Sequence, residues 1–302
     1  MVAGAATAAS AGTSEGGVMR LYVAYLATDG GADAVALGVR LARTMSAQLD
    51  IGMVLPPDRS AALHSGDFED VLTSQATDWL TEATVGLPDD IEIKTHIAFH
   101  DSAAEGIITE AQRLGADAIV VGGSGGGIVG GHTLGSVVTE LVHSAPLPIV
   151  LAPRGLRRSK VTRVREITCA LGTRAGADTL FDTAVAASQR AQVPLRVVSL
   201  VALDRAAGYR GSPEEALADA TRHAHERLDE ARSHLPADAT VTWDVVDGPT
   251  VEEAVNKLEW NDGDLIMVGS SRLAAPRRLF LGSTAAKMLR VLQVPMVVTP
   301  AD

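Results

Sequence analysis

The sequence predicts an α/β protein built from two tandem, doubly wound domains, each with an open parallel sheet of five strands. Three observations lead to this fold. The 302 residues suffice for two domains of about 150 residues each. Short apolar runs alternate with longer amphipathic segments, and a glycine-rich sequence of the first half recurs 147 residues later. Alternating strands and helices imply right-handed crossovers, with helices on both faces of each sheet.

The internal repeat places the domain boundaries at 19–153 and 161–302. Two pairs of similar segments carry it: 27–33 with 172–178, and 134–153 with 281–300. Self-similarity at a fixed spacing indicates duplicated structural units. The basic, proline-containing segment 154–160 is the predicted linker. Residues 1–18 are mostly small and predict a disordered tail, and Met19 is an alternative start of translation.

Apolar runs rich in Val, Ile, Leu and Ala predict strands that are covered on both faces. In the first domain, the predicted strands are 21–26, 49–55, 91–98, 118–121 and 149–151. Between them, helical patterns occupy 31–45, 67–84, a segment beginning near Ser102 and a segment following Ser136. In the second domain, the predicted strands lie near 165–171, 195–201, 240–246, 264–268 and 296–299.

Composition excludes several classes of protein. A net charge of −11 argues against nucleic-acid binding and against binding to anionic membranes. No apolar run approaches the roughly 20 residues of a membrane-spanning helix, and the first 18 residues lack the basic start of a secretory signal. The expected location is therefore the cytoplasm. The single cysteine, Cys169, excludes a disulfide framework and is expected to be a buried thiol.

A glycine motif in the first domain predicts an anion-binding site. Gly122 and Gly125 follow the strand 118–121, and after nine further residues Gly135 and Ser136 open a helix. Glycines let backbone N–H groups approach phosphate oxygens, and a helix N-terminus carries partial positive charge. The motif lacks the lysine of a P-loop, so backbone dipoles and a bound Mg²⁺ would neutralise the phosphates.

A second loop is expected at the same crevice. Thr28, Asp29 and Gly30 follow the first predicted strand, as the glycine motif follows the fourth. In open parallel sheets, ligands bind at the carboxyl ends of the strands, where the strand order reverses. The sequence therefore directs both loops towards one site.

The second domain repeats the motif with one change that predicts a degenerate site. The repeated positions are Gly269, Arg272, Gly282 and Ser283. Arg272 replaces a glycine and would project into the space that phosphates occupy. Together with Arg277 and Arg278 it could hold an anion. The favoured alternative is that Arg272 pairs with a carboxylate and blocks the site.

The strand pattern and the spacing of Gly122, Gly125, Gly135 and Ser136 resemble those of the universal stress protein family over 19–153 and 161–300. The resemblance implies ATP binding in the first domain. It implies contacts to phosphate or ribose from Gly122, Gly125, Gly135 and Ser136, with Val137 beside them and Val54 against adenine. It further implies pairing of the last strands, near Ile149 and Met296, and allows a homodimer of the whole chain.

One position departs from the family pattern. Members that bind ATP usually carry an aspartate at the end of the first strand, where this sequence has Leu26. Asp29 replaces that aspartate only if its loop is longer and folds back. The corresponding segment of the second domain, 170–173, contains no acid. The missing partner removes one or two hydrogen bonds of about 1 kcal/mol each.

The histidines do not assemble a metal site. His96 and His100 lie on a predicted strand, where residues four apart are separated by roughly 13 Å. His223 and His225 are expected on the solvated surface of a helix. His132, between Gly125 and Ser136, is expected to be an exposed loop histidine, with contact to a phosphate as the alternative. No metal site formed by protein side chains is expected.

The predicted function is that of an ATP-binding regulatory stress protein whose second domain is a structural partner. Nucleotide occupancy would be read by an unidentified protein. No catalytic set is found: Ser136 and Ser283 are predicted helix N-caps, and ATP hydrolysis would be incidental. One alternative is a scaffold that binds no nucleotide. The other is an adenylyl-transferring enzyme. Such enzymes usually have a phosphate-loop lysine or a histidine signature, and this sequence shows neither.

Overall fold

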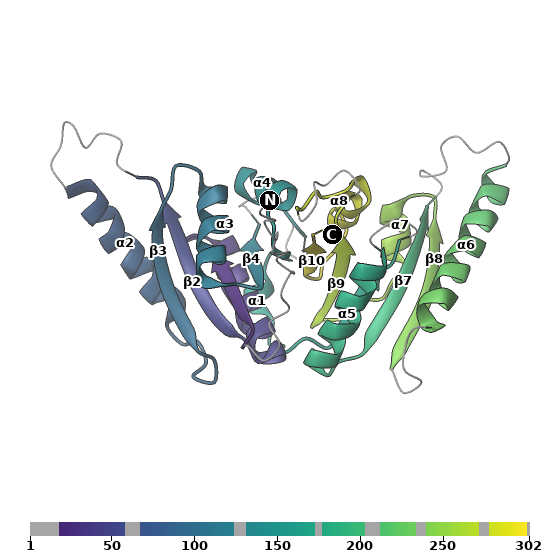
Figure 1. Ribbon diagram of the computed structural model, residues 1–302, viewed down its shortest axis with the longest axis horizontal. Helices are drawn as coiled ribbons and strands as arrows, with labels where there is room; N and C mark the ends of the chain where they lie inside the picture. The colour runs from purple at the N-terminus through teal and green to yellow at the C-terminus, as the bar shows by residue number, and fades with distance from the viewer. Residues whose placement is uncertain are drawn as a thin grey trace, which may run out of the picture.

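The computed structural model describes residues 18–57, 67–123, 131–172, 177–202, 212–233, 240–271 and 278–300. Its strands form one ten-stranded sheet in the order β3-β2-β1-β4-β5-β10-β9-β6-β7-β8. Neighbouring strands are parallel except β5 and β10, which are antiparallel. The sheet therefore consists of two five-stranded parallel halves that meet at β5 and β10 (Figure 1).

The helices and strands follow the predicted order, and the predicted ends differ from the observed ones by two residues at most. The first half contains β1 (Arg20–Ala24), α1 (Asp29–Met45), β2 (Gln48–Leu55), α2 (Asp67–Thr84), β3 (Ile93–Phe99), α3 (Ala103–Leu114), β4 (Ala118–Gly122), α4 (Ser136–Ser144) and β5 (Ile149–Ala152). The second half contains β6 (Glu166–Ala170), α5 (Ala177–Ala191), β7 (Leu195–Ala202), α6 (Pro213–Ser233), β8 (Val241–Gly248), α7 (Val251–Asn256), β9 (Asp264–Gly269), α8 (Ser283–Leu289) and β10 (Met296–Thr299). A short 3₁₀ turn, η1 (Leu156–Arg158), lies between the halves.

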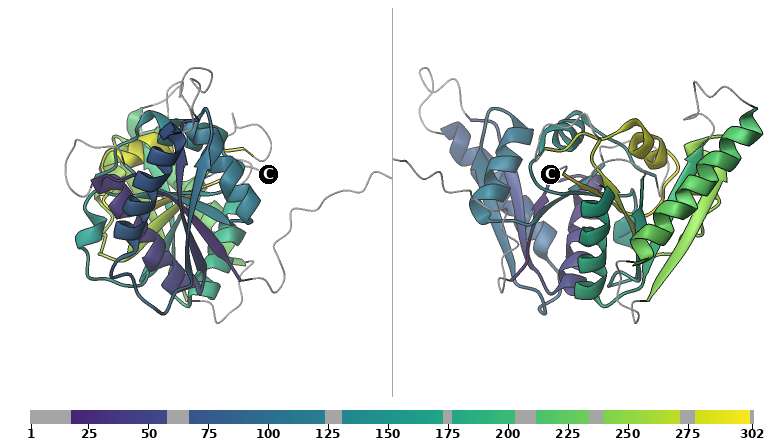
Figure 2. Two further views of the ribbon diagram at one scale, coloured as in Figure 1. Left: turned by 90° about the vertical axis from the view of Figure 1, so that its left-hand side faces the viewer. Right: turned by 45° about the vertical axis from the view of Figure 1, so that its right-hand side comes forward.

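Helices cover both faces of the sheet, as predicted for a doubly wound fold (Figure 2). One apolar cluster joins the sheet to α1, α2, α5 and α6, and another joins it to α3, α4, α7 and α8. Successive strand residues alternate between the faces, so Leu21 and Val23 belong to the first cluster and Tyr22 to the second. Each cluster contains residues of both halves, and the core is therefore continuous across the junction.

The junction is the antiparallel pairing of β5 with β10. Leu151 lies opposite Met296, and Ile149 lies opposite Val298. Ile149, Met296 and Val298 are fully buried. This confirms the expected pairing of the last strand of the first half with the last strand of the second half. Full burial of such a side chain contributes about 1.5–3 kcal/mol, so the halves share core packing in addition to backbone hydrogen bonds.

The segment predicted as a linker lies along α1. Asp33, which is 1% exposed, accepts hydrogen bonds from the backbone N–H groups of Gly155 at 2.8 Å and Arg157 at 3.0 Å. The Arg157 guanidinium also donates to this carboxylate. Eleven residues further along α1, the Thr44 hydroxyl accepts from the N–H of Val164 at 2.8 Å. One face of α1 therefore binds the connecting segment over its length.

Between these two points, Arg40 holds the end of the connecting segment. Its side chain is 4% exposed and donates to the Val161 carbonyl at 3.0 Å and to the Ser159 hydroxyl at 2.5 Å. It also reaches Asp262, in the turn before β9, at 3.3 Å. Arg40 thereby links α1, the connecting segment and the second half.

Substitution of Asp33 by alanine is expected to lower the free energy of unfolding by about 3 kcal/mol, because two backbone N–H groups and a guanidinium lose a buried acceptor. Denaturant titration followed by circular dichroism measures this change. The matched control is Asp90→Ala, which removes an exposed ion pair between Arg43 of the same helix and Asp90 and should change stability little. Equal effects of the two substitutions would contradict the structural role of Asp33.

Cys169 lies in β6 and is fully buried, as predicted. Burial raises the pKa of its thiol to about 12. The thiolate, which is the reactive form, is therefore scarce in the folded protein at neutral or mildly alkaline pH.

Alkylation of Cys169 by iodoacetamide should be at least about 100-fold slower in the folded protein at pH 8 than in denaturant, because the thiol is both inaccessible and protonated. Raising the pH to 9 should accelerate the reaction of the folded protein only slightly. Mass spectrometry follows the adduct. Ser74→Cys in a Cys169→Ser background, at an exposed position of α2, provides a reactive control. Rapid labelling of folded wild-type protein would show that β6 is accessible.

Candidate functional site

The loops after β1 and β4 contact each other through their backbones. A Cβ atom on Gly122 would lie 1.8 Å from the carbonyl oxygen of Gly30, and one on Gly30 would lie 1.9 Å from that of Gly123. Neither position has space for a side chain. The close approach therefore requires glycine at the end of β4 and in the first turn of α1. These loops lie at the carboxyl edge of the first half.

The start of α1 directs Asp29 towards the connecting segment. Thr28 is the N-cap, and its hydroxyl accepts from the N–H of Gly31 at 3.2 Å. Asp29 is the first helical residue; its carboxylate is 73% exposed and lies 2.8 Å from Nη2 of Arg157. Leu26, at the position where the family pattern has aspartate, is 56% exposed. In this structure Asp29 is thus paired with Arg157.

The start of α4 differs from the prediction. The N-cap is Gly135, whose carbonyl accepts from the N–H of Thr139 at 2.8 Å and which makes no side-chain capping bond. The second half is alike, since Gly282 caps α8 and its carbonyl accepts from Ala286. The prediction that Ser136 and Ser283 are N-caps is therefore wrong. Each serine is instead the first residue of its helix.

The consequence is a helix start without a side-chain capping bond, in the second part of the glycine motif. The first N–H groups of a helix have no partner inside the helix, and glycine contributes no side-chain acceptor to them. Ser136 is exposed, and no described residue accepts from or donates to its hydroxyl. Backbone donors, the helix dipole and a free hydroxyl are features that bind anions.

Val54 and Val137 lie on the face of the sheet covered by α3 and α4. Both are partly buried and pack against the apolar cluster of that face. Val54 also contacts α3 closely, because a Cβ atom on Gly106 would lie 2.6 Å from Cγ1 of Val54. Asp29 begins α1, which packs on the opposite face. The structure thus places both valines on the face of α4 and the Asp29 carboxylate beside the connecting segment.

Gly125 lies outside the described residues, as do Arg272 and Arg277 of the second motif. In the second half, the described ends of the loop are joined by hydrogen bonds. The N–H of Ser271 donates to the Phe280 carbonyl at 2.8 Å, and the N–H of Phe280 donates to the Ser270 hydroxyl at 2.7 Å. Ser270 occupies the position equivalent to Gly123. The second loop is therefore closed by a side chain that the first loop lacks.

Gly269, at the end of β9, has space for a side chain, whereas Gly122 has none. A Cβ atom on Gly269 would lie 3.7 Å from the Leu180 side chain, an ordinary contact distance. The first-turn residues equivalent to Gly30 and Gly31 are outside the described part of the chain. Gly282 is followed by Ser283 at the start of α8, as Gly135 is followed by Ser136.

His132 contacts the second half of the protein. Its Nε2 donates to the backbone carbonyl of Val294, 162 residues later in the chain, at 2.8 Å. Burial lowers the pKa of His132 to about 4, so the ring is neutral at physiological pH. The expectation of an exposed loop histidine is therefore wrong. The acceptor belongs to the second half, 162 residues away, and is not visible in the local sequence.

His96 and His100 contact polar groups of the first half. Nε2 of His96 lies 2.6 Å from the buried carboxylate of Asp50, and Nδ1 of His100 lies near the backbone of Ser102. His223 and His225 are exposed on α6, as predicted. Among the described residues, no group of three or more His, Cys, Asp or Glu side chains could hold a metal ion. In that same part of the chain, no helix is both long and apolar enough to cross a membrane.

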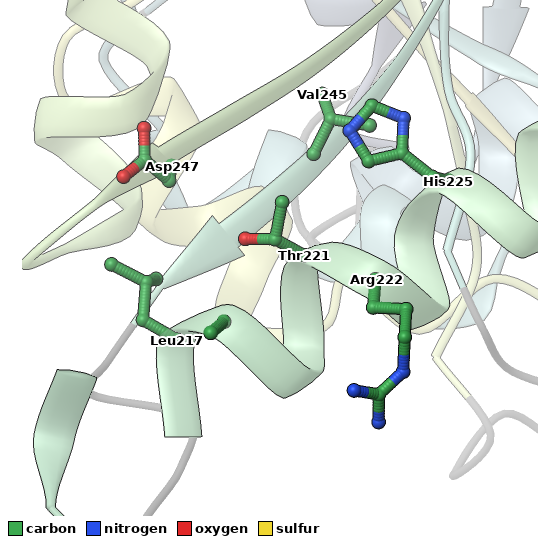
Figure 3. Close-up of a pocket in the computed structure, with 7 residues that line it drawn as sticks. Leu217, Thr221, Arg222, His225, Val245 and Asp247 are labelled. Carbon is green, nitrogen blue, oxygen red and sulfur yellow. The ribbon is translucent and has the colours of Figure 1, made fainter. Parts of the chain in front are cut away.

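An open groove lies between α6 and β8, at the outer edge of the second half (Figure 3). Its lining residues are Leu217, Ala218, Thr221, Arg222, His225, Val245 and Asp247. The charged groups have partners, since Asp247 pairs with Lys257, and Arg222 pairs with Asp219 and Glu226. The groove is distant in the sheet order from β4 and contains none of the predicted site residues.

Comparison with known proteins agrees with this architecture. A family model described as the universal stress protein family matches residues 18–153 and 164–300. Universal stress proteins of Mycobacterium bovis and Mycobacterium tuberculosis are each 27% identical over 295 residues, covering 93% of this chain and 100% of the relative.

Solved structures show the same fold. A universal stress protein from Archaeoglobus fulgidus has a TM-score of 0.62 at 16% identity, covering 93% of this chain and 98% of that protein. One from Pseudomonas aeruginosa has a TM-score of 0.57 at 17% identity, covering 94% of each chain. With two matches to the family model that together span most of its length, the chain belongs to the universal stress protein family.

Proposed function

We propose that the first half binds ATP at the carboxyl edge of its sheet and that the second half is a structural partner without a nucleotide. The observation that carries the proposal is the start of α4. Gly135 caps this helix without a side-chain bond, and Ser136 is exposed beside it. Both belong to the glycine motif that begins with Gly122 and Gly125.

The residues around this helix start suit the parts of a nucleotide. Backbone N–H groups of the first turn of α4 and the Ser136 hydroxyl would donate to phosphate oxygens. Val54 and Val137, partly buried on the same face, would offer apolar contact to adenine. Mg²⁺ would arrive with the nucleotide and be held mainly by phosphate oxygens and water.

Asp29 is proposed to join the site on ribose binding. Its carboxylate is largely exposed and forms an ion pair with Arg157. Exposed ion pairs contribute little to stability. Exchanging Arg157 for a ribose hydroxyl would therefore cost little free energy. The side chain would have to turn from the connecting segment towards the sheet edge.

The second half departs from the pattern at two neighbouring positions. Ser270 closes the loop by its hydrogen bond to Phe280, and Arg272 replaces the second glycine of the motif. Both changes add a side chain where the first half has glycine. We infer a regulatory protein with one site, in which nucleotide occupancy is read by a protein partner and ATP hydrolysis is incidental.

A scaffold that binds no nucleotide is the second candidate function. Leu26 is exposed where an aspartate would meet the nucleotide, and Asp29 already has a partner in Arg157. In this alternative, the glycines serve only the close approach of the loops after β1 and β4.

Calorimetric titration of Mg-ATP distinguishes the two functions. Wild type should bind, and Gly125→Arg, which copies Arg272 into the first loop, should weaken binding at least about 10-fold, a loss of about 1.4 kcal/mol. Ser136→Ala should weaken binding about 5-fold, because one hydrogen bond of about 1 kcal/mol is lost. The alanine variant should keep wild-type thermal stability, since the hydroxyl does not cap the helix.

Arg272→Ala is the matched control, because it changes the corresponding position of the half that is proposed not to bind. Its affinity for ATP should equal that of wild type. Absence of binding by a well-folded wild-type protein would favour the scaffold. Equal binding by wild type and a folded Gly125→Arg variant would show that the assigned loop is not the site.

A further inference from the structure

The second half of the protein holds the C-terminal end of α4. The N–H of Leu281 donates to the Val142 carbonyl at 2.9 Å, and that of Leu279 donates to the Ala145 carbonyl at 2.9 Å. The Arg278 guanidinium donates to the Ser144 carbonyl at 2.7 Å. The last carbonyls of a helix lack partners within it, and a cation there complements the helix dipole. The second half supplies both.

Apolar contacts strengthen this attachment. Leu279 and Leu281 are buried in the same cluster as Val142 and Ala145. The rings of His143 and Phe280 meet edge to face, with their centroids 4.9 Å apart. In Figure 1, α4 of the first half and α8 of the second half both lie at the top of the junction. The C-terminal end of α4 is therefore packed as part of the shared core.

The second half also holds the loop that leads into α4. His132 lies three residues before Gly135 and donates through Nε2 to the Val294 carbonyl at 2.8 Å. Val294 is 5% exposed and lies in the turn between α8 and β10. Near it, the Gly131 carbonyl accepts from the N–H of Arg154 at 3.0 Å. Both ends of α4 are thus attached to structure outside the first five strands and their helices.

The two halves are not equivalent in this respect. The repeat places Leu279 at the position of His132. Leu279 has no polar side chain and contributes a backbone N–H and buried apolar surface. A side-chain hydrogen bond across the junction therefore holds the loop of the first half, the half with the intact glycine motif.

We propose that the second half positions residues 131–135 and α4 of the first half, with His132 as a positioning residue. The inference rests on the proposed ATP site in the first half and names what keeps that site in a binding geometry. ATP affinity would then depend on contacts from the second half, although the second half itself does not touch the nucleotide. By linkage, ATP would in turn strengthen the attachment of the two halves.

The first test measures the free protein, so it does not depend on nucleotide binding. Hydrogen exchange of the backbone amides of 131–137 should be at least about 10-fold faster in His132→Phe, which keeps an aromatic ring and loses the donor. His132→Gln, whose amide can donate to Val294, should exchange within about twofold of wild type. His223→Phe, the same substitution on the exposed surface of α6, should leave the segment unchanged. Equal exchange in His132→Phe and wild type would overturn the proposal.

The second test titrates Mg-ATP into the same variants. His132→Phe should weaken binding about 5- to 20-fold, and Arg278→Ala about 3-fold, whereas His132→Gln should bind like wild type. Gly125→Arg should lose affinity without faster exchange of 131–137, because it alters the site and not its attachment. A His132→Phe variant that exchanges faster but binds ATP as wild type does would also overturn the proposal.

The two proposals fail in different ways. If wild type binds no ATP, the proposed function fails, and the exchange measurement still decides whether His132 holds the loop. If wild type binds ATP and His132→Phe is unchanged in both measurements, the ATP site stands and the positioning role of His132 is rejected. A general loss of stability on replacing His132 is recognised with His132→Gln. This variant would then also exchange faster and bind ATP more weakly than wild type, although its side chain can still donate to Val294.

Discussion

The antiparallel pairing of β5 with β10 is the constraint on which the rest of the structure depends. Among the described strands it is the one place where the direction of the sheet reverses, and it joins two parallel halves into one sheet with a continuous core. Because the last strand of each half forms the junction, residues 278–281, which precede α8, reach the end of α4 there. The contacts of Leu279 and Leu281 with α4, and of His132 with Val294, follow from this arrangement.

The connecting segment adds a second attachment on the other face. One side of α1 binds this segment through Asp33, Arg40 and Thr44. Arg40 also donates a hydrogen bond to Asp262 of the second half. The same α1 approaches the end of β4 so closely that Gly30 and Gly122 exclude any side chain. The elements that border the candidate site are therefore held from two directions, which favours a preorganised binding geometry.

The two halves of the duplicated fold differ at positions that bear on the proposed site. The first half keeps glycine at 123, where the second has Ser270 bonded to Phe280, and it has His132 where the second has Leu279. One half would bind and the other would support the binding site. In this proposed arrangement the second repeat would be retained for its packing rather than for a ligand of its own.

The sequence by itself determined the two repeats, the order of the strands and helices, and the buried state of Cys169, since each depends on local periodicity and spacing. It also placed the loops after β1 and β4 at one sheet edge, because parallel strands dictate this. Only the tertiary structure decided that Gly135 caps α4, that Arg157 pairs with Asp29, and that Val294 accepts from His132. The last two partners lie 128 and 162 residues away in sequence. Such contacts arise from how the halves pack, which no local pattern encodes.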